Sequence, residues 1–261
     1  MSVLIGFVIL SATTFDPAAR FEAVPVEPPP LFAAVLEDPP PPVMHRWTGA
    51  VSAGASISSG NTDKETASAT GDVEYRREKD RTSFNLLWNY SSEDGIGVTE
   101  RRVYGMGKYD YFLSKRAYAL ASLSGEYNYA AQLDLRSIAS VGAGYQFLET
   151  ATSKLSGEAG LAYVDESYFS SADDAEYVAA RLAYKLDFKF GEKVELAQTG
   201  EVVPSLEDSE DVSSKLDTRL QLTLTKAMFA QLQHLWTWDN TPATGADRSD
   251  HLLLLSLGWK F

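Results

Sequence analysis

Cysteine is absent from this chain of 261 residues, and only three histidines occur. The lack of cysteine excludes a disulfide scaffold and thiolate-bound zinc, and three histidines leave little for a histidine-rich metal site. We therefore predict no cofactor and no metal centre. Basic residues are also scarce, 23 against 36 acidic ones, for a net charge of -13. This balance argues against nucleic acid as a partner, because its binding needs clustered Lys and Arg.

Long apolar runs are missing as well. No stretch of about 18 apolar residues occurs, so the sequence offers no transmembrane helix. A membrane protein is still possible in principle, because the strands of a membrane barrel alternate and keep half of their residues polar.

The N-terminal region differs from the rest of the chain. A short apolar run, Val3 to Leu10, is followed by small residues and indicates a signal-like segment over residues 1–24. Prolines then cluster, which predicts an extended periplasmic linker over residues 25–45. Residues 46–261 are predicted to form one β-barrel domain.

The last eleven residues have the pattern of an amphipathic strand. One face carries Leu253, Leu255, Leu257, Trp259 and Phe261, and the other carries Leu254, Ser256, Gly258 and Lys260. A final amphipathic strand that ends on an aromatic residue is typical of bacterial outer-membrane barrels and resembles the signal read by the barrel-assembly machinery. We predict Trp259 and Phe261 as this assembly signal. A soluble sandwich or lipocalin-like barrel is the alternative, because alternation alone does not tell which face is inside.

From Arg46 onward the apolar residues recur at every second position in about twelve segments. Tight connections, such as Gly191-Glu192, alternate with longer ones, which are predicted around residues 93–98, 130–134, 166–175, 205–211 and 239–248. An even number of strands, with short turns at one end and long loops at the other, predicts an all-β, transmembrane up-and-down antiparallel barrel. Both termini then lie on the periplasmic side.

The predicted barrel opens with Trp47 and Gly49 and continues to Gly60-Asn61-Thr62. This pattern, with the terminal Gly-Trp-Lys-Phe, resembles the YdiY-like family over residues 46–261. Its members are described as salt-induced outer-membrane proteins and classed as a domain of unknown function. The resemblance implies a barrel of the Gram-negative outer membrane with a link to salt or osmotic response, and little about activity. Gly60-Asn61 also fits an ordinary turn.

Inward-facing charges form the candidate site. They are predicted to line the lumen from the eighth to the tenth strand: Arg181, Lys185, Asp187, Lys189, Glu195, Glu201, Lys215, Asp217 and Arg219. Antiparallel pairing about Gly191 would place Lys189 opposite Glu195 and Lys185 diagonal to Glu201. These charges either line a narrow path for a small solute or ion, or fill the lumen as a salt-bridged core without a pore. The sequence leaves both alternatives open.

We expect no enzyme. A membrane hydrolase needs a nucleophile beside a base, and Trp236, not serine, stands two residues after the outward-facing His234.

The long loops are acidic and the short turns basic. Acidic surface loops indicate outer-membrane lipids, including lipopolysaccharide, as partners. Divalent cations would bridge the carboxylates to these lipids, since such cations prefer carboxylate oxygens.

Overall fold

The computed structural model describes residues 46–58, 64–170 and 174–261. Within them lie twelve strands: β1 (Arg46–Ser58), β2 (Lys64–Arg76), β3 (Asp80–Glu93), β4 (Gly97–Phe112), β5 (Ala117–Asn128), β6 (Leu133–Glu149), β7 (Ser153–Tyr168), β8 (Ala175–Phe190), β9 (Val194–Pro204), β10 (Val212–Thr223), β11 (Met228–Asp239) and β12 (Ser249–Lys260). The signal-like segment, the linker and the Gly60-Asn61-Thr62 element lie outside the described residues. No helix long and apolar enough to cross a membrane occurs in this described part.

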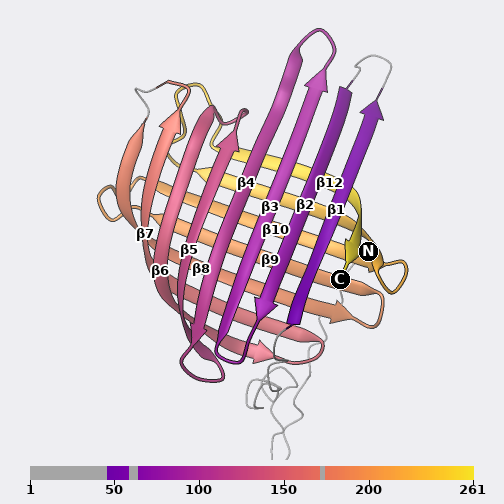
Figure 1. Cartoon of the computed structure of the whole chain (residues 1–261). Coiled ribbons are helices and arrows are strands. Elements are labelled where there is room, and N and C mark those ends of the chain that lie inside the picture. The colour runs from indigo at the N-terminus through magenta and orange to yellow at the C-terminus, as the bar shows by residue number, and fades with distance from the viewer. Residues whose placement is uncertain (1–45, 59–63, 171–173) are drawn as a thin grey trace, which may run out of the picture.

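Every strand pairs antiparallel with its sequence neighbours, and β12 pairs with β1, so the sheet closes into a barrel. This confirms the predicted up-and-down barrel of twelve strands. Figure 1 shows β1 to β4 in front, running steeply, and β9, β10 and β12 behind them, crossing at a large angle. The strands of the front and back walls are therefore strongly tilted against one another, as closure of a barrel requires.

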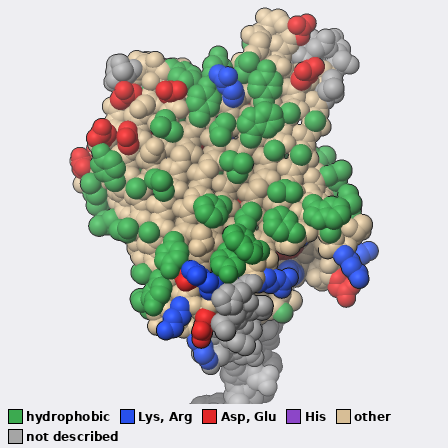
Figure 2. All heavy atoms as spheres, in the orientation of Figure 1, with side chains coloured by type: hydrophobic (Ala, Val, Ile, Leu, Met, Phe, Trp, Pro, Cys, Tyr) green, Lys and Arg blue, Asp and Glu red, His purple; other side chains and the backbone are tan. Residues whose placement is uncertain are grey.

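The apolar face of each strand points outward. On β12, Leu253 and Leu255 are 66% and 73% exposed, whereas Leu252 and Leu254 are 6% and 4% exposed. Figure 2 shows hydrophobic side chains spread over the middle of the barrel wall, with most carboxylates toward the upper rim and Lys and Arg toward the lower rim. A soluble barrel would bury its apolar face in the interior. This barrel exposes its apolar face on the outside, so the polarity of its wall is the reverse of that in a soluble barrel.

Outward aromatic side chains gather near both ends of the strands. Trp47 and Tyr75 stack at 4.6 Å near the short turns, and Phe169 lies 6.1 Å from Tyr127 near the long loops. Two aromatic belts separated by aliphatic side chains are the pattern of a barrel wall in contact with lipid.

The connections differ from the prediction in two places. Residues 94–96 and 129–132 are as short as the turns at the other end, although both were expected to be long. The reason is that β3 and β4 stay paired up to Glu93 and Gly97, beyond the predicted strand ends. Gly95 and Gly97 have φ values of 77° and 93°, which allow the chain to reverse tightly. The long connections 205–211 and 240–248 are confirmed.

Candidate functional site in the barrel lumen

The lumen contains a cavity of about 470 Å³ near the short turns. Its lining includes the β6–β7 turn, residues 150–152, and Lys260 at the end of β12, so it lies in the half of the barrel that holds both ends of the domain. All nine charged side chains of the predicted site line this cavity: Arg181, Lys185, Asp187, Lys189, Glu195, Glu201, Lys215, Asp217 and Arg219. We call this cavity the vestibule.

The register of β8 and β9 matches the prediction, but the ion pairs do not follow it. Lys189 is the partner of Glu195 in the sheet, yet Glu195 accepts from Lys260 of β12 at 2.8 Å. Glu201 likewise pairs with Arg181 at 2.6 Å, not with Lys185. Lys189 makes no ion pair within the described residues. The predicted register therefore holds, but Glu195 takes its partner from β12, which is not adjacent to β9, and Glu201 takes its partner from another position on β8.

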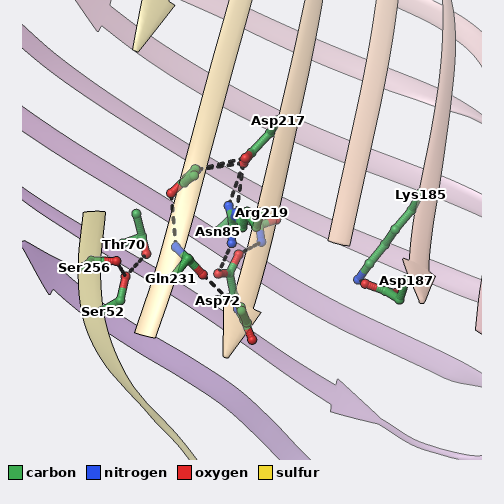
Figure 3. Close-up of polar contacts among 12 residues, drawn as sticks. Ser52, Thr70, Asp72, Asn85, Lys185, Asp187, Asp217, Arg219, Gln231 and Ser256 are labelled. Carbon is green, nitrogen blue, oxygen red and sulfur yellow. Dashed lines mark hydrogen bonds and ion pairs between the residues drawn. The ribbon is translucent and has the colours of Figure 1, made fainter. Parts of the chain in front are cut away.

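Arg219 ties two opposite walls of the vestibule together. It donates to Asp217 of its own strand at 2.8 Å and to Asp72 of β2 across the lumen. Asn85 donates to Asp72 at 2.6 Å, and Gln233 donates to Asp217 at 3.0 Å. Figure 3 shows this network on one side of the space and the Lys185–Asp187 pair apart from it on the other. Each carboxylate here has more than one donor, so the network is held from several strands.

Glu126 of β5 is the centre of a second network at the middle of the barrel. Its carboxylate accepts from Arg102 of β4 and, at 3.3 Å, from Lys215 of β10. The Lys215 ammonium also lies 3.2 Å from the centre of the Tyr104 ring. Arg102 is only 2% exposed. One buried carboxylate therefore neutralises two cations, and side chains from opposite walls meet across the lumen.

An apolar cluster fills the space beside this network. It consists of Leu87 from β3, Leu235 from β11, and Leu252 and Leu254 from β12, with Tyr104 packed against it. The front and back walls of the barrel therefore touch through leucine side chains. We call these five residues the leucine cluster.

Further ion pairs lie in the half of the lumen near the long loops. Arg136 of β6 pairs with Glu166 of β7 at 2.6 Å and with Asp239 of β11 at 2.5 Å. A small cavity of about 70 Å³ lies in this half. In the loop before β10, burial raises the pKa of the Asp211 carboxyl above its usual range, although Thr241 donates a hydrogen bond to it.

Charged residues of β4 to β7 that take part in the lumen ion pairs were not among the predicted site residues. They are Arg102, Lys108, Asp110, Glu126, Arg136, Glu158 and Glu166. Each stands at an inward position of the alternation, which is the signal that could have found them. On β4 to β7 such residues are scattered among Ser and Gly, whereas on β8 to β10 they follow one another closely.

The outer wall carries a row of polar side chains that was also not predicted. Tyr184 donates to Gln198 at 2.8 Å, and Gln198 donates to Thr218 at 2.9 Å. Ring nitrogens of His234 and His251 lie 3.1 Å apart. These residues come from β8 to β12 and form a band on the otherwise apolar face.

At the end of this band Trp236 donates to the Ser249 hydroxyl at 2.8 Å. The Ser249 hydroxyl is 3.5 Å from His251, at the long limit of a hydrogen bond. The indole therefore holds the hydroxyl more closely than the imidazole does. Among the described residues, no three His, Asp or Glu side chains converge where a metal ion could bind.

Similar solved structures include the translocator domain of the autotransporter NalP from Neisseria meningitidis, with 12% identity, 82% of this chain and 87% of that chain covered, and a TM-score of 0.43. They also include the NanC porin, with 10% identity, coverage of 82% and 96%, and a TM-score of 0.45. A third is an anion-selective porin from Comamonas acidovorans, with 9% identity, coverage of 83% and 99%, and a TM-score of 0.39. At such identities and TM-scores these likenesses say nothing about what this barrel does.

No curated protein matches the chain. A family model does match, over residues 51–261, which is nearly the whole predicted barrel. The chain belongs to the family described as "Protein of unknown function, DUF481".

Proposed function

We propose that this protein is a barrel of the bacterial outer membrane whose lumen opens to the periplasm as a solute-binding vestibule and is closed toward the cell surface. The reversed polarity of the wall supports the membrane location. Exposed side chains such as Leu232, Leu255 and Val141 make most of the outer face apolar, which is unfavourable in water and favourable in lipid. Contacts between opposite walls of the lumen are the observation that carries the functional part.

Contacts between walls that are not neighbours in the sheet support a closed lumen. Lys108 of β4 pairs with Glu158 of β7, and Asn128 of β5 donates to Asp250 of β12 at 3.3 Å. With the Glu126 network and the leucine cluster, these contacts narrow the path between the vestibule and the long loops in the part of the chain that the structure describes. A conducting porin keeps a water-filled channel instead.

The vestibule suits a small anionic solute. Lys154 and Lys189 line it and make no ion pair within the described residues, and Lys185 reaches Asp187 only at 3.9 Å. Lysines with no ion pair, or with only a long one, are available to an anion that enters from the periplasm.

A narrow channel is the second candidate. The vestibule and the smaller cavity share three lining residues, Tyr104, Glu201 and Lys215. A modest movement of these side chains would join the two cavities. The barrel would then conduct small ions through a single constriction.

We further propose the orientation and the partners. The acidic loops would face the cell surface, where lipopolysaccharide and divalent cations are available, and the basic turns would face the periplasm. The barrel-assembly machinery would engage the strand that ends with Trp259 and Phe261. From the family resemblance alone, we also propose a role in the response to salt or osmotic stress.

Three single cysteines test the orientation and the closed lumen together, because the chain has no cysteine of its own. With a small, membrane-impermeant maleimide on intact cells, D247C in a long loop is expected to react. K193C in a short turn and K185C in the vestibule are expected to react only after the outer membrane is permeabilised. Labelling of K185C on intact cells would contradict a closed lumen, and labelling of K193C there would contradict the orientation.

A further inference from the structure

Arg101 of β4 is a basic side chain on the lipid-facing side of the wall. Arg101 and Val103 are exposed, whereas Arg102 between them is buried, so the Arg101 side chain points outward. It lies near the start of β4, at the end of the barrel that carries the long loops. Most Lys and Arg lie toward the opposite rim (Figure 2). A guanidinium in contact with hydrocarbon is costly, so a cation at this place needs a polar partner.

Aromatic side chains of the belt near the long loops hold Arg101. Its guanidinium donates to the Tyr127 hydroxyl at 3.0 Å. The guanidinium carbon lies 5.4 Å from the centre of the Tyr127 ring and 5.9 Å from that of Tyr129. The Tyr129 backbone N–H donates to the Arg101 carbonyl at 2.9 Å, and the Phe169 ring lies 5.9 Å from the Tyr129 ring. We call Arg101, Tyr127, Tyr129 and Phe169 the arginine cradle.

The cation of the cradle is not neutralised by a carboxylate. Within the described residues Arg101 makes no ion pair, while the adjacent Arg102 pairs with Glu126 inside the lumen. On the outer wall, Glu176 accepts instead from the Tyr163 hydroxyl at 2.7 Å. The Tyr127 hydroxyl uses one of the guanidinium N–H donors, and others remain. A phosphate can accept two such donors side by side, so the cradle suits a phosphate group.

The position of the cradle identifies the kind of molecule that carries this phosphate. The wall around it faces lipid, so the phosphate belongs to a lipid headgroup. From the cradle toward the short turns, the same outward face carries the exposed side chains Val103, Leu123 and Val141, from β4, β5 and β6. A lipid with its phosphate at Arg101 therefore has apolar wall beneath it for its acyl chains.

We propose that the arginine cradle binds a phosphate of lipid A, the membrane anchor of lipopolysaccharide. The proposal rests on the proposed function, because the orientation given there places this end of the barrel in the outer leaflet. Arg101 donates to the phosphate, and the Tyr129 and Phe169 rings lie beside the sugar headgroup. The acidic loops need a divalent cation to reach such a phosphate, whereas Arg101 reaches it directly. The cradle therefore holds lipid A when no divalent cation is present.

Arg77 provides a matched control at the other end of the barrel. Its guanidinium carbon lies 5.8 Å from the centre of the Tyr75 ring, in the belt near the short turns. Unlike Arg101, Arg77 pairs with a carboxylate, that of Asp80, at 2.7 Å. The two arginines thus share an exposed position beside a tyrosine but differ in whether the charge is already neutralised. R101Q should weaken the binding of lipid A, and R77Q should not.

Native mass spectrometry of the folded protein in detergent, with EDTA present, measures this binding. The probes are lipid A with two phosphates, the same lipid A without its phosphates, and phosphatidylglycerol. The wild-type protein and R77Q are expected to bind the phosphorylated lipid A equally. R101Q is expected to bind it about tenfold more weakly, because a charge-assisted pair is lost. Removing the phosphates should weaken binding to the wild-type protein to a similar degree.

Three results would overturn the proposal. They are equal binding of phosphorylated lipid A by R101Q and the wild-type protein, an equal loss in R77Q, and binding of phosphatidylglycerol as tight as that of lipid A. Both variants change exposed side chains, and the heat-modifiable band on gels verifies that they are folded. Protein in a detergent micelle has no periplasmic side, so the outcome does not depend on the maleimide labelling that tests the orientation.

Discussion

Replacing Glu126 by Gln is expected to destabilise the barrel more than any other single change in the lumen. The substitution keeps the shape of the side chain and removes the one carboxylate that pairs with both Arg102 and Lys215. Both cations would remain in the packed middle of the barrel. Loss of one partner from a buried pair costs about 3–5 kcal/mol, because the remaining charge is left uncompensated. The free energy of unfolding, measured by urea titration in lipid vesicles, should fall by an amount of this size.

Asp187→Asn is the matched control. It also removes a carboxylate from the lumen, but the Asp187 partner, Lys185, lies at 3.9 Å with a side chain that is 53% exposed. Water can solvate that lysine, so this variant should unfold close to the wild-type urea concentration. Equal stability of Glu126→Gln and Asp187→Asn would show that the Glu126 network does not hold the lumen closed.

Deletion of Phe261 is expected to have the second large effect. A smaller fraction of the protein should fold into the barrel. Phe261 supplies two backbone hydrogen bonds to Gly49, and the seam between β1 and β12, which has four further paired positions, depends on them. Its ring also lies against Gly49, where a side chain would collide with it. Without this rung the barrel edge is open to water or to other chains. The heat-modifiable folded form should decrease on gels, both in cells and after refolding.

Phe190→Ala separates this effect from the general loss of an aromatic side chain. Phe190 is 53% exposed at the same end of the barrel but belongs to β8, away from the seam. We expect this variant to fold nearly as well as the wild-type protein. If the Phe261 deletion folds equally well in cells and in vesicles, the terminal strand is neither the closing element nor an assembly signal.

The fold could be predicted because a barrel wall repeats one simple pattern. The alternation on β12, with Leu253 and Leu255 against Leu254 and Ser256, fixes the period of the strand without reference to any other residue. Strand number followed from twelve such segments. The alternation alone did not give the direction of the apolar face, because a soluble barrel shows the same alternation. The transmembrane prediction rested instead on the alternation of short and long connections and on the terminal Phe261, and the exposure of the outward leucines agrees with it.

The ion pairs of the lumen could not be predicted in the same way. Register on one hairpin places Lys189 opposite Glu195, but Lys260 reaches Glu195 from β12. Partners such as Glu126 and Lys215 come from opposite walls, and their distance depends on barrel tilt and closure, which local spacing does not encode. The leucine cluster was missed for a related reason. Its inward leucines are exceptions to the alternation of polar and apolar residues.

The electrical conductance of single molecules in a planar lipid bilayer tests the closed lumen most directly. The wild-type protein, inserted in its heat-modifiable folded form, is expected to give no conductance steps at high KCl. Removing the constriction between the two cavities with Tyr104→Ala and Lys215→Ala keeps the Arg102–Glu126 pair and should produce steps. Stable steps from the wild-type protein at low voltage would contradict the closed lumen and favour the narrow channel.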